Sequence, residues 1–430
     1  MAEKIISPGV FTNEIDQSFL PATAGPIGAA IVGPTVKGPI LEPTVVSSYS
    51  EYVQIFGELI ESGSDKFQYL TSHAAQEYLR QGGPLTVVRV GEPGLTKASA
   101  TIKAGDVDVF DLEVIGNGPS FNNSGSLQDD NGRIAPLTSS ITNDHFGSGS
   151  FGGRGDNFRH EVSQRNLSRG TFTLVLRQGN DETTKKKVIE TFENLSLDPE
   201  SPNYILKRIG NQTSTIVTED GQSFVQQTGE FPNRSKNVRV KTLNIKTPDY
   251  LKEDGTINDG IYADGETSIP MLGSGSANGT FSGGDFGSQN AVHPFNFYLA
   301  IDSDTNSQGV NLATSAATLG TGGYKTAINL LKNKDEFDID MLFIPGILDQ
   351  NGTNSNTIVG DAISMCEDRG DCFLVYDNTF LTDTVANAKT NTEARNSSFA
   401  AAYYPWVQIQ DTTTGNFRYV PPSVVIAGVY

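Results

Sequence analysis

The side chains best suited to metal or acid–base chemistry are few and scattered along this chain. The 430 residues include four histidines: His73, His145, His160 and His293. None has a cysteine or carboxylate neighbour at the spacing of zinc ligands, so we expect no metal site. His73 lies beside the apolar face of a predicted helix, which favours a packing or surface role. Local context suggests no Ser-His-Asp or Cys-His set, so the sequence predicts neither an enzyme active site nor a cofactor.

The two cysteines and one adhesion-like tripeptide have simple structural interpretations. Cys366 and Cys372 fall on a predicted helix and on the strand after it, where both are expected to pack as small hydrophobic side chains. Two cysteines in so long a chain do not form a disulfide scaffold, which favours a reducing compartment. The "RGD" of Arg154–Asp156 is short enough to recur by chance, and we interpret it as a plain turn.

Two segments resemble ligand-binding loops but lack required residues. "GTGGYKT" (Gly320–Thr326) resembles a phosphate-binding loop, yet Tyr324 stands where the motif requires glycine, and no predicted strand leads into it. "DSDTNSQG" (Asp302–Gly309) resembles a calcium-binding loop. Ser307 stands at its glycine position and Ala313 at the position of its bidentate glutamate, so the ligand set is incomplete.

The elements that would position any site follow an α/β pattern near the N-terminus. An apolar run that ends in glycine is followed by two amphipathic helices and a second apolar run. Ser48 or Ser50 is the predicted cap of the first helix, and Gly57 its end. The four segments are Gly25–Gly33, Ser47–Gly57, Phe67–Gly83 and Leu85–Val90.

The same pattern returns in the last quarter of the chain. The sequence predicts helix, strand, helix and strand over Tyr324–Lys334, Ile339–Gly346, Asn354–Gly370 and Cys372–Asp377. Ser355 or Asn356 is the candidate cap of the second helix. Strands joined through a helix form a parallel pair with a right-handed crossover. We therefore predict a multidomain α/β (α+β) protein whose core is built from both ends of the chain and interrupted by inserted β-rich domains.

The middle of the chain has a different composition, rich in Gly, Ser, Asn and Thr. Alternating runs at Thr171–Gln178 and Phe295–Ile301 predict strands. A helix is predicted near 185–195, because Val188, Ile189, Phe192 and Leu195 would share one face. Residues 273–290 are predicted to be a flexible loop outside the core. The predicted organisation is a linking arm (1–20), a first core part (21–90), an inserted β-rich domain (91–245), a second loop-rich insert (246–320) and a second core part (321–430).

Net charge and hydropathy argue against a nucleic-acid-binding surface, a membrane span and a signal peptide. The net charge of −19 argues against a phosphate-binding surface, so we expect no nucleic-acid partner. No apolar run approaches the ~20 residues that a membrane span needs. The N-terminal residues before Pro8 contain no apolar segment of the signal-peptide kind.

The N-terminal segment raises a separate question, because it has strand-forming residues and no local partner. "MAEKIISPGVFTNEIDQSFLP" places β-branched and apolar residues around a Pro-Gly break. No second strand follows at hairpin distance. The segment is either a disordered tail or a strand that pairs with another subunit. The candidate pairing residues are Ile5, Ile6, Pro8, Gly9, Val10, Phe11 and Ile15.

Several stretches together resemble the tail sheath proteins of contractile-tailed (myovirus-type) bacteriophages. They are Ser7–Val10 ("SPGV"), Gly25–Gly57, Tyr78–Val90, Asn194–Tyr204, Leu342–Gly346 ("LFIPG") and Ala401–Tyr430. The resemblance covers both α/β ends of the chain well and the inserted middle part sparsely. No single motif is decisive, but the order and spacing of the set are specific.

This resemblance implies a non-enzymatic, structural protein of the virion. Sheath subunits stack as hexameric rings around a tail tube, and the cylinder contracts to drive the tube through the host envelope during genome delivery. The implied partners are neighbouring sheath subunits, the tail tube protein, and baseplate and tail terminator proteins. Assembly in the host bacterial cytoplasm is implied, with extended arms adding strands to neighbouring sheets. The inserts are expected to decorate the outer face.

Other possibilities stay open at this point. The same fold could serve a phage-like contractile injection system of the bacteriocin or secretion type. A more distant alternative is an α/β hydrolytic enzyme, which requires an acid, a base and a nucleophile clustered at strand ends. Family members continue beyond the segment that ends in "PPSVVIAGVY" (Pro421–Tyr430), which reads as a buried strand or a helix start. Either the whole protein has a further core portion and a second linking arm, without which this chain would form no regular tubes, or this sheath is unusually short.

Overall fold

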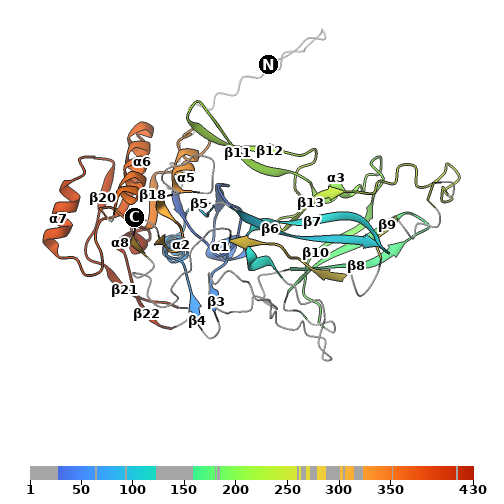
Figure 1. Cartoon of the computed structure of the whole chain (residues 1–430), viewed down its shortest axis with the longest axis horizontal. Coiled ribbons are helices and arrows are strands. Elements are labelled where there is room, and N and C mark those ends of the chain that lie inside the picture. The colour runs from blue at the N-terminus through green and yellow to red at the C-terminus, as the bar shows by residue number, and fades with distance from the viewer. Residues whose placement is uncertain are drawn as a thin grey trace, which may run out of the picture.

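A computed structural model describes most of the chain and divides it into an α/β core and a β-rich body (Figure 1). In Figure 1 the core lies on the left and the antiparallel sheets extend to the right. The described residues are 28–430 except 63–64, 93, 123–157, 180, 182–184, 259–260, 263–267, 272–277, 287–300, 304–305, 314–322, 351 and 413–414.

The core is built on a six-stranded sheet to which both ends of the chain contribute. Its order is β2 (Thr44–Val46), β5 (Leu85–Arg89), β1 (Ala29–Gly33), β18 (Met341–Leu348), β19 (Phe373–Asp377) and β20 (Ala400–Ala402). All neighbours are parallel except β2, which runs antiparallel to β5 at one edge. Ala29 lies opposite both Leu85 and Met341, so the central strand joins the two halves of the sequence. The predicted core from both chain ends is confirmed.

Helices cover both faces of this sheet, which explains why its strands are apolar at successive positions. One face packs on α1 (Tyr49–Phe56), α2 (Leu70–Gln81) and α8 (Pro422–Ile426) through residues such as Ile31 and Phe343. The other face packs on α5 (Tyr324–Leu330) and α6 (Thr353–Arg369) through residues such as Val32 and Leu342. A further helix, α7 (Val385–Glu393), connects β19 to β20.

Both ends of α1 lie where the sequence predicts them, whereas the start of α6 differs from the prediction. Ser48 caps α1 by accepting a hydrogen bond from the backbone N–H of Glu51, and Gly57 ends the helix as predicted. The predicted caps of α6 were wrong, because the helix begins at Thr353, after Gly352. Ser355 instead lies inside the first turn, where its hydroxyl donates to the carbonyl of Gly352.

The β-rich body contains two four-stranded antiparallel sheets. The first has the order β13 (Val238–Leu243), β7 (Val107–Asn117), β6 (Leu95–Ala104) and β15 (Asp285–Phe286). The second has the order β10 (Val188–Ser196), β9 (Thr171–Gln178), β8 (Phe158–Asn166) and β14 (Asn278–Thr280). They share one apolar core, in which the rings of Phe110 and Phe172 stack at 5.8 Å between centroids. The helix α3 (Ile205–Ile209) and the short η1 (Pro119–Phe121) complete this body.

Two expectations for the middle of the chain are corrected. Residues 188–196 form strand β10 and no helix, because they pair along β9 and expose Val188 and Ile189 that a shared helical face would bury. Their β-branched side chains suit a strand. Within the segment 273–290, predicted to be a flexible loop, residues 278–286 include strands β14 and β15, which pair with β8 and β6, and Phe281, which is fully buried in the core of this body.

The remaining described strands form two-stranded ribbons. They are β3 (Ile60–Ser62) with β4 (Asp65–Phe67), β11 (Thr213–Glu219) with β12 (Gln222–Thr228), β16 (Ile301–Ser303) with β17 (Asn306–Ser307), and β21 (Val407–Gln410) with β22 (Phe417–Val420). Of the predicted strand at Phe295–Ile301, only Ile301 lies within the described residues, in β16. None of the helices in the described ranges is long and apolar enough to cross a membrane.

One ribbon connects the β-rich body back to the α/β core. The tip of β11–β12 reaches α5, where the Asn329 side chain accepts the backbone N–H of Ser223 at 2.6 Å and donates to the carbonyl of Gly221 at 3.0 Å. Ile216 and Val225 of the ribbon pack against the same face of the core. This part of the insert therefore lies on the core. The domain boundaries given above, and the outer-face position of the insert, stay predictions.

Candidate functional site

The predicted linking residues Ile5, Ile6, Pro8, Gly9, Val10, Phe11 and Ile15 lie outside the described residues. The structure can still show where an added strand would find unpaired backbone groups. In the six-stranded sheet the edges are β2 and β20, and each is only three residues long. The ribbon β21–β22 has longer strands, and within the described part of the chain each of them pairs only with the other.

The ribbon β21–β22 has one face packed on the core and one face in solvent. Gln410 lies opposite Phe417, and Gln408 lies opposite Tyr419, on the outer face. Phe417 is 67% exposed and Tyr419 is 44% exposed, whereas Val420 on the inner face is fully buried. Exposed aromatic side chains on a ribbon with open edges are what a strand-binding surface presents to a partner.

Buried contacts fix this ribbon to the α/β core. Trp406, next to β21, is buried and donates its indole N–H to the carbonyl of Thr379 at 2.7 Å. On the inner face Arg418 forms a buried ion pair with Asp411 at 3.2 Å. An isolated two-stranded ribbon is marginal in water, so these contacts explain why the ribbon is stable before any partner binds.

His73 on α2 takes part in the same packing and is buried. Burial lowers its pKa to about 4; the nearby Asp411 carboxylate opposes this shift and the Arg418 guanidinium adds to it. The side chain is therefore neutral at physiological pH. The packing role predicted for His73 is confirmed, and the structure places it in the core beneath the ribbon.

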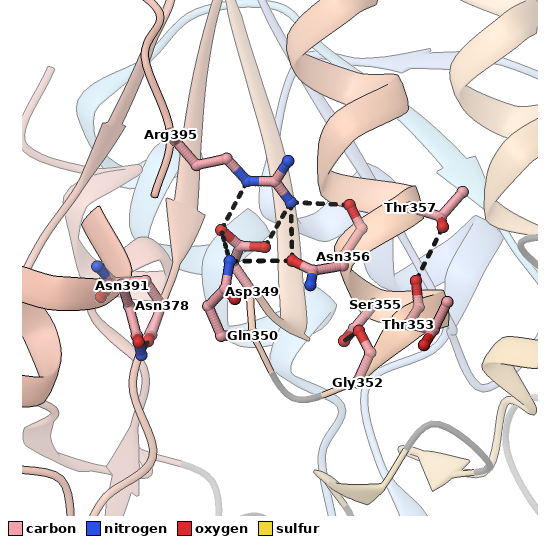
Figure 2. Close-up of polar contacts among 10 residues, drawn as sticks. All are labelled: Asp349, Gln350, Gly352, Thr353, Ser355, Asn356, Thr357, Asn378, Asn391 and Arg395. Atoms are coloured by element: carbon pink, nitrogen blue, oxygen red, sulfur yellow. Dashed lines mark hydrogen bonds and ion pairs between the residues drawn. The ribbon is translucent and has the colours of Figure 1, made fainter. Parts of the chain in front are cut away.

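A second candidate site is the carboxyl edge of the parallel strands, where α/β folds bind ligands. Figure 2 shows the end of β18, where Arg395 makes a bidentate contact with Asp349, with distances of 2.9 Å from Nε and 2.6 Å from Nη2. Nη2 also donates to the backbone and side-chain oxygens of Asn356 in the first turn of α6. Gln350 donates to that same side-chain oxygen at 3.0 Å. Arg395 therefore connects β18, α6 and the segment after α7.

At the end of β19, Asp377 is also occupied by structural contacts. It accepts hydrogen bonds from the backbone N–H of Ser423 at 3.0 Å and from the Ser423 hydroxyl at 2.6 Å. Burial raises the pKa of the Asp377 carboxyl to about 6, although both hydrogen bonds lower it. These contacts hold the start of α8 against the sheet.

The chemistry-bearing residues of the sequence do not converge on this edge. His160 lies in the β-rich body, where its ring packs edge-on against Phe281 at 5.7 Å, while His145, His293 and Arg154–Asp156 lie outside the described residues. Cys366 and Cys372 are both buried and free. Among the described residues no group of three or more His, Cys, Asp or Glu side chains could hold a metal ion.

The segment that resembles a calcium loop has a packing role where it is described. The Ser307 hydroxyl donates to the carbonyl of Gly346 at 2.6 Å. The Gln308 amide accepts from the backbone N–H of Leu70 and donates to the carbonyl of Pro345. These side chains connect α2 to β18, so their polar groups are used inside the core.

Sequence reasoning missed the ribbon β21–β22, although a signal was present. "VQIQ" and "FRYV" alternate in polarity and flank the turn residues "DTTTGN", which is the pattern of a hairpin. It also missed Asp349 and Asp377 as anchors, although Asp349 comes soon after one predicted strand and Asp377 is the last residue of another.

Comparison with known proteins gives a structural similarity and no sequence match. No family model matches the sequence, and no curated protein matches it. The chain is structurally similar to the sheath tail protein of Listeria innocua, with a TM-score of 0.44, 11% identity, 95% of this chain covered and 56% of that one. It is also similar to the sheath tail protein of Desulfitobacterium hafniense, with a TM-score of 0.37, 11% identity and coverages of 98% and 61%. The chain thus spans less than two thirds of the length of either protein.

Proposed function

We propose that this protein is a non-enzymatic structural subunit of a contractile tail sheath. The observation that carries the proposal is the ribbon β21–β22, which buried contacts fix to an α/β core, which pairs with no other strand among the described residues, and which has an exposed aromatic face. The predicted N-terminal strand Ile5–Ile15, which no second strand follows in the sequence at hairpin distance, would supply the complementary element. Strand addition uses backbone hydrogen bonds, so it connects subunits while placing few demands on side chains.

In this proposal the arm of one subunit pairs with the ribbon of its neighbour. The Pro8-Gly9 break and the segment after Ile15 let subunit bodies rotate while the strand stays paired. The subunits form stacked hexameric rings around a tail tube, contact baseplate and terminator proteins, and contract to deliver a phage genome. They belong to the virion and assemble in the host cytoplasm. A phage-like contractile injection system is the alternative, and neighbouring capsid and terminase genes would identify a phage.

A binding experiment tests the arm and the ribbon directly. A labelled peptide of residues 1–20 should bind the chain from which residues 1–20 have been deleted, and the deletion should leave the melting transition unchanged. In the whole native protein the same deletion should abolish the tubes seen by electron microscopy. If the deletion unfolds the body, the segment is an intramolecular strand and the proposed linkage is wrong.

A further inference from the structure

A polar cavity lies where the base of the ribbon β11–β12 meets the first antiparallel sheet. Its volume is about 350 Å³. Lys97 of β6 and Arg239 of β13 line one side, and Ser214 and Gln227 of the ribbon line another. Glu42, from the segment before β2, completes the wall. The proposed sheath function uses none of these side chains.

Lys97 is a half-buried ammonium group for which the described residues provide no hydrogen bond or ion pair. The carboxylate of Glu113, whose charge acts on Lys97, is engaged by two other cations, because it binds Arg239 at 3.0 Å and Lys241 at 3.1 Å. Burial lowers the pKa of Lys97, and the charge of Glu113 opposes this shift. The charged side chains that line the cavity are two cations, Lys97 and Arg239, and one carboxylate, Glu42, and Arg239 is already paired with Glu113. A desolvated positive charge of this kind favours a bound anion.

The rim of the cavity supplies neutral hydrogen-bonding groups. The Gln227 amide donates to the Ser214 hydroxyl at 3.2 Å, and the Asn233 amide donates to the carbonyl of Gln212 at 2.8 Å. The side-chain oxygens of Gln227 and Asn233 accept no hydrogen bond from the described residues, and both residues are exposed. Such amide and hydroxyl groups bind hydroxyl groups of a ligand.

We propose that this cavity binds a small hydroxylated anion, a sugar that carries a phosphate or carboxylate group. Lys97 contacts the anionic group, and the amides and hydroxyls of the rim contact the sugar hydroxyls. A metal cation does not fit, because Lys97 and Arg239 line the same space. A nucleic-acid strand does not fit either, because the cavity is small and the chain carries a net charge of −19.

Calorimetric titration of the full chain with four probes tests this proposal. Glucose 6-phosphate and glucuronate should bind saturably, with a Kd of about 1 mM or tighter, whereas glucose and inorganic phosphate should each bind at least about tenfold more weakly. Lys97→Met should weaken both binders by about tenfold or more. Lys103→Met is the matched control, because Lys103 lies on the same strand but pairs with Asp108 in solvent, and it should bind like the unmodified chain.

A second measurement does not depend on any variant. Lys97 in the unmodified chain should be protected by glucose 6-phosphate from an amine-reactive label, while Lys103 should not be protected. The proposal is wrong if neither anionic sugar binds the unmodified chain, if glucose binds as tightly as glucose 6-phosphate, or if Lys97→Met binds with unchanged affinity. Equal labelling of Lys97 with and without ligand would also overturn it.

Discussion

Replacing Asp377 by asparagine should change how the free energy of unfolding depends on pH, and the structure determines the sign of that change. Asp377 is buried at the end of β19 and its pKa is raised from 3.8 to about 6. The folded state therefore binds this proton more tightly than the unfolded state does. The carboxyl stabilises the folded state most below pH 4, and that contribution is lost as pH rises through 6. A shift of about two pKa units corresponds to roughly 3 kcal/mol.

Asp377→Asn removes the buried charge and keeps the shape of the side chain. Its amide oxygen can accept the Ser423 backbone N–H, and its NH₂ group can donate to the Ser423 hydroxyl, so both contacts of the native carboxyl have counterparts. We expect the variant to gain stability relative to the native chain between pH 4 and pH 7, by up to roughly 3 kcal/mol.

Denaturant unfolding at pH 4, 5, 6 and 7 measures this difference. Asp368→Asn is the control, because Asp368 lies on the surface beside Lys332 and its exposed ion pair contributes less than about 1 kcal/mol. The control should show a difference from the native chain that is nearly independent of pH. A flat difference for Asp377→Asn, or one that favours the native chain as pH rises, would refute the reasoning.

Three further predictions concern the ribbons and the β-rich body. Phe417→Ser should weaken binding of the peptide of residues 1–20 by about tenfold or more, because burying an aromatic side chain contributes about 1.5–3 kcal/mol. The control Val188→Ser, at an exposed position of β10, should bind the peptide normally, and equal loss in both variants would count against the ribbon. Asn329→Ala should lower the free energy of unfolding by about 1–3 kcal/mol and speed proteolysis at the tip of β11–β12, because it removes both side-chain hydrogen bonds to the tip. An unchanged rate of cleavage would mean that other contacts hold the tip. Asp181→Asn should lower the free energy of unfolding in urea by about 3–5 kcal/mol, because Asp181 pairs with two buried guanidinium groups, Arg177 at 2.6 Å and Arg159 at 3.4 Å, and of these Arg177 keeps a second carboxylate, Glu161, at 2.8 Å. A loss below about 1 kcal/mol would contradict this.

Elements with a strong local signal could be predicted from the sequence. The strand at Thr171–Gln178 and the Ser48 cap of α1 have the expected positions, because alternation and capping are properties of neighbouring residues. The segment 188–196 could not be predicted in this way. Its apolar residues have the spacing of one helical face. The segment nevertheless forms a strand, because it pairs with β9, and this pairing depends on tertiary contacts that a local pattern does not contain.

The candidate sites depend even more on contacts between distant residues. Asp349 and Arg395 are 46 positions apart, and Gln308 contacts Leu70 across 238 positions. No local pattern indicates which of these polar side chains is an anchor inside the fold and which is free to bind. Likewise, no local pattern shows that Glu113 pairs with Arg239 and Lys241, while Lys97 has no ion pair within the described residues.

The order of strands in the core has a consequence for how the chain folds during synthesis. Ala29 in β1 pairs with Met341 in β18, so the central pair of the sheet closes a loop of more than 300 residues. The ribosome must release nearly four fifths of the chain before this pairing is available, while the β-rich body between them already has its own apolar core. The β-rich body can therefore fold first, while the core sheet is still incomplete and contains β1 and β5 without β18. Such late, non-local pairing slows folding and leaves strand edges open to aggregation. Until β18 is synthesised, the side of β1 that it will cover is therefore an open strand edge.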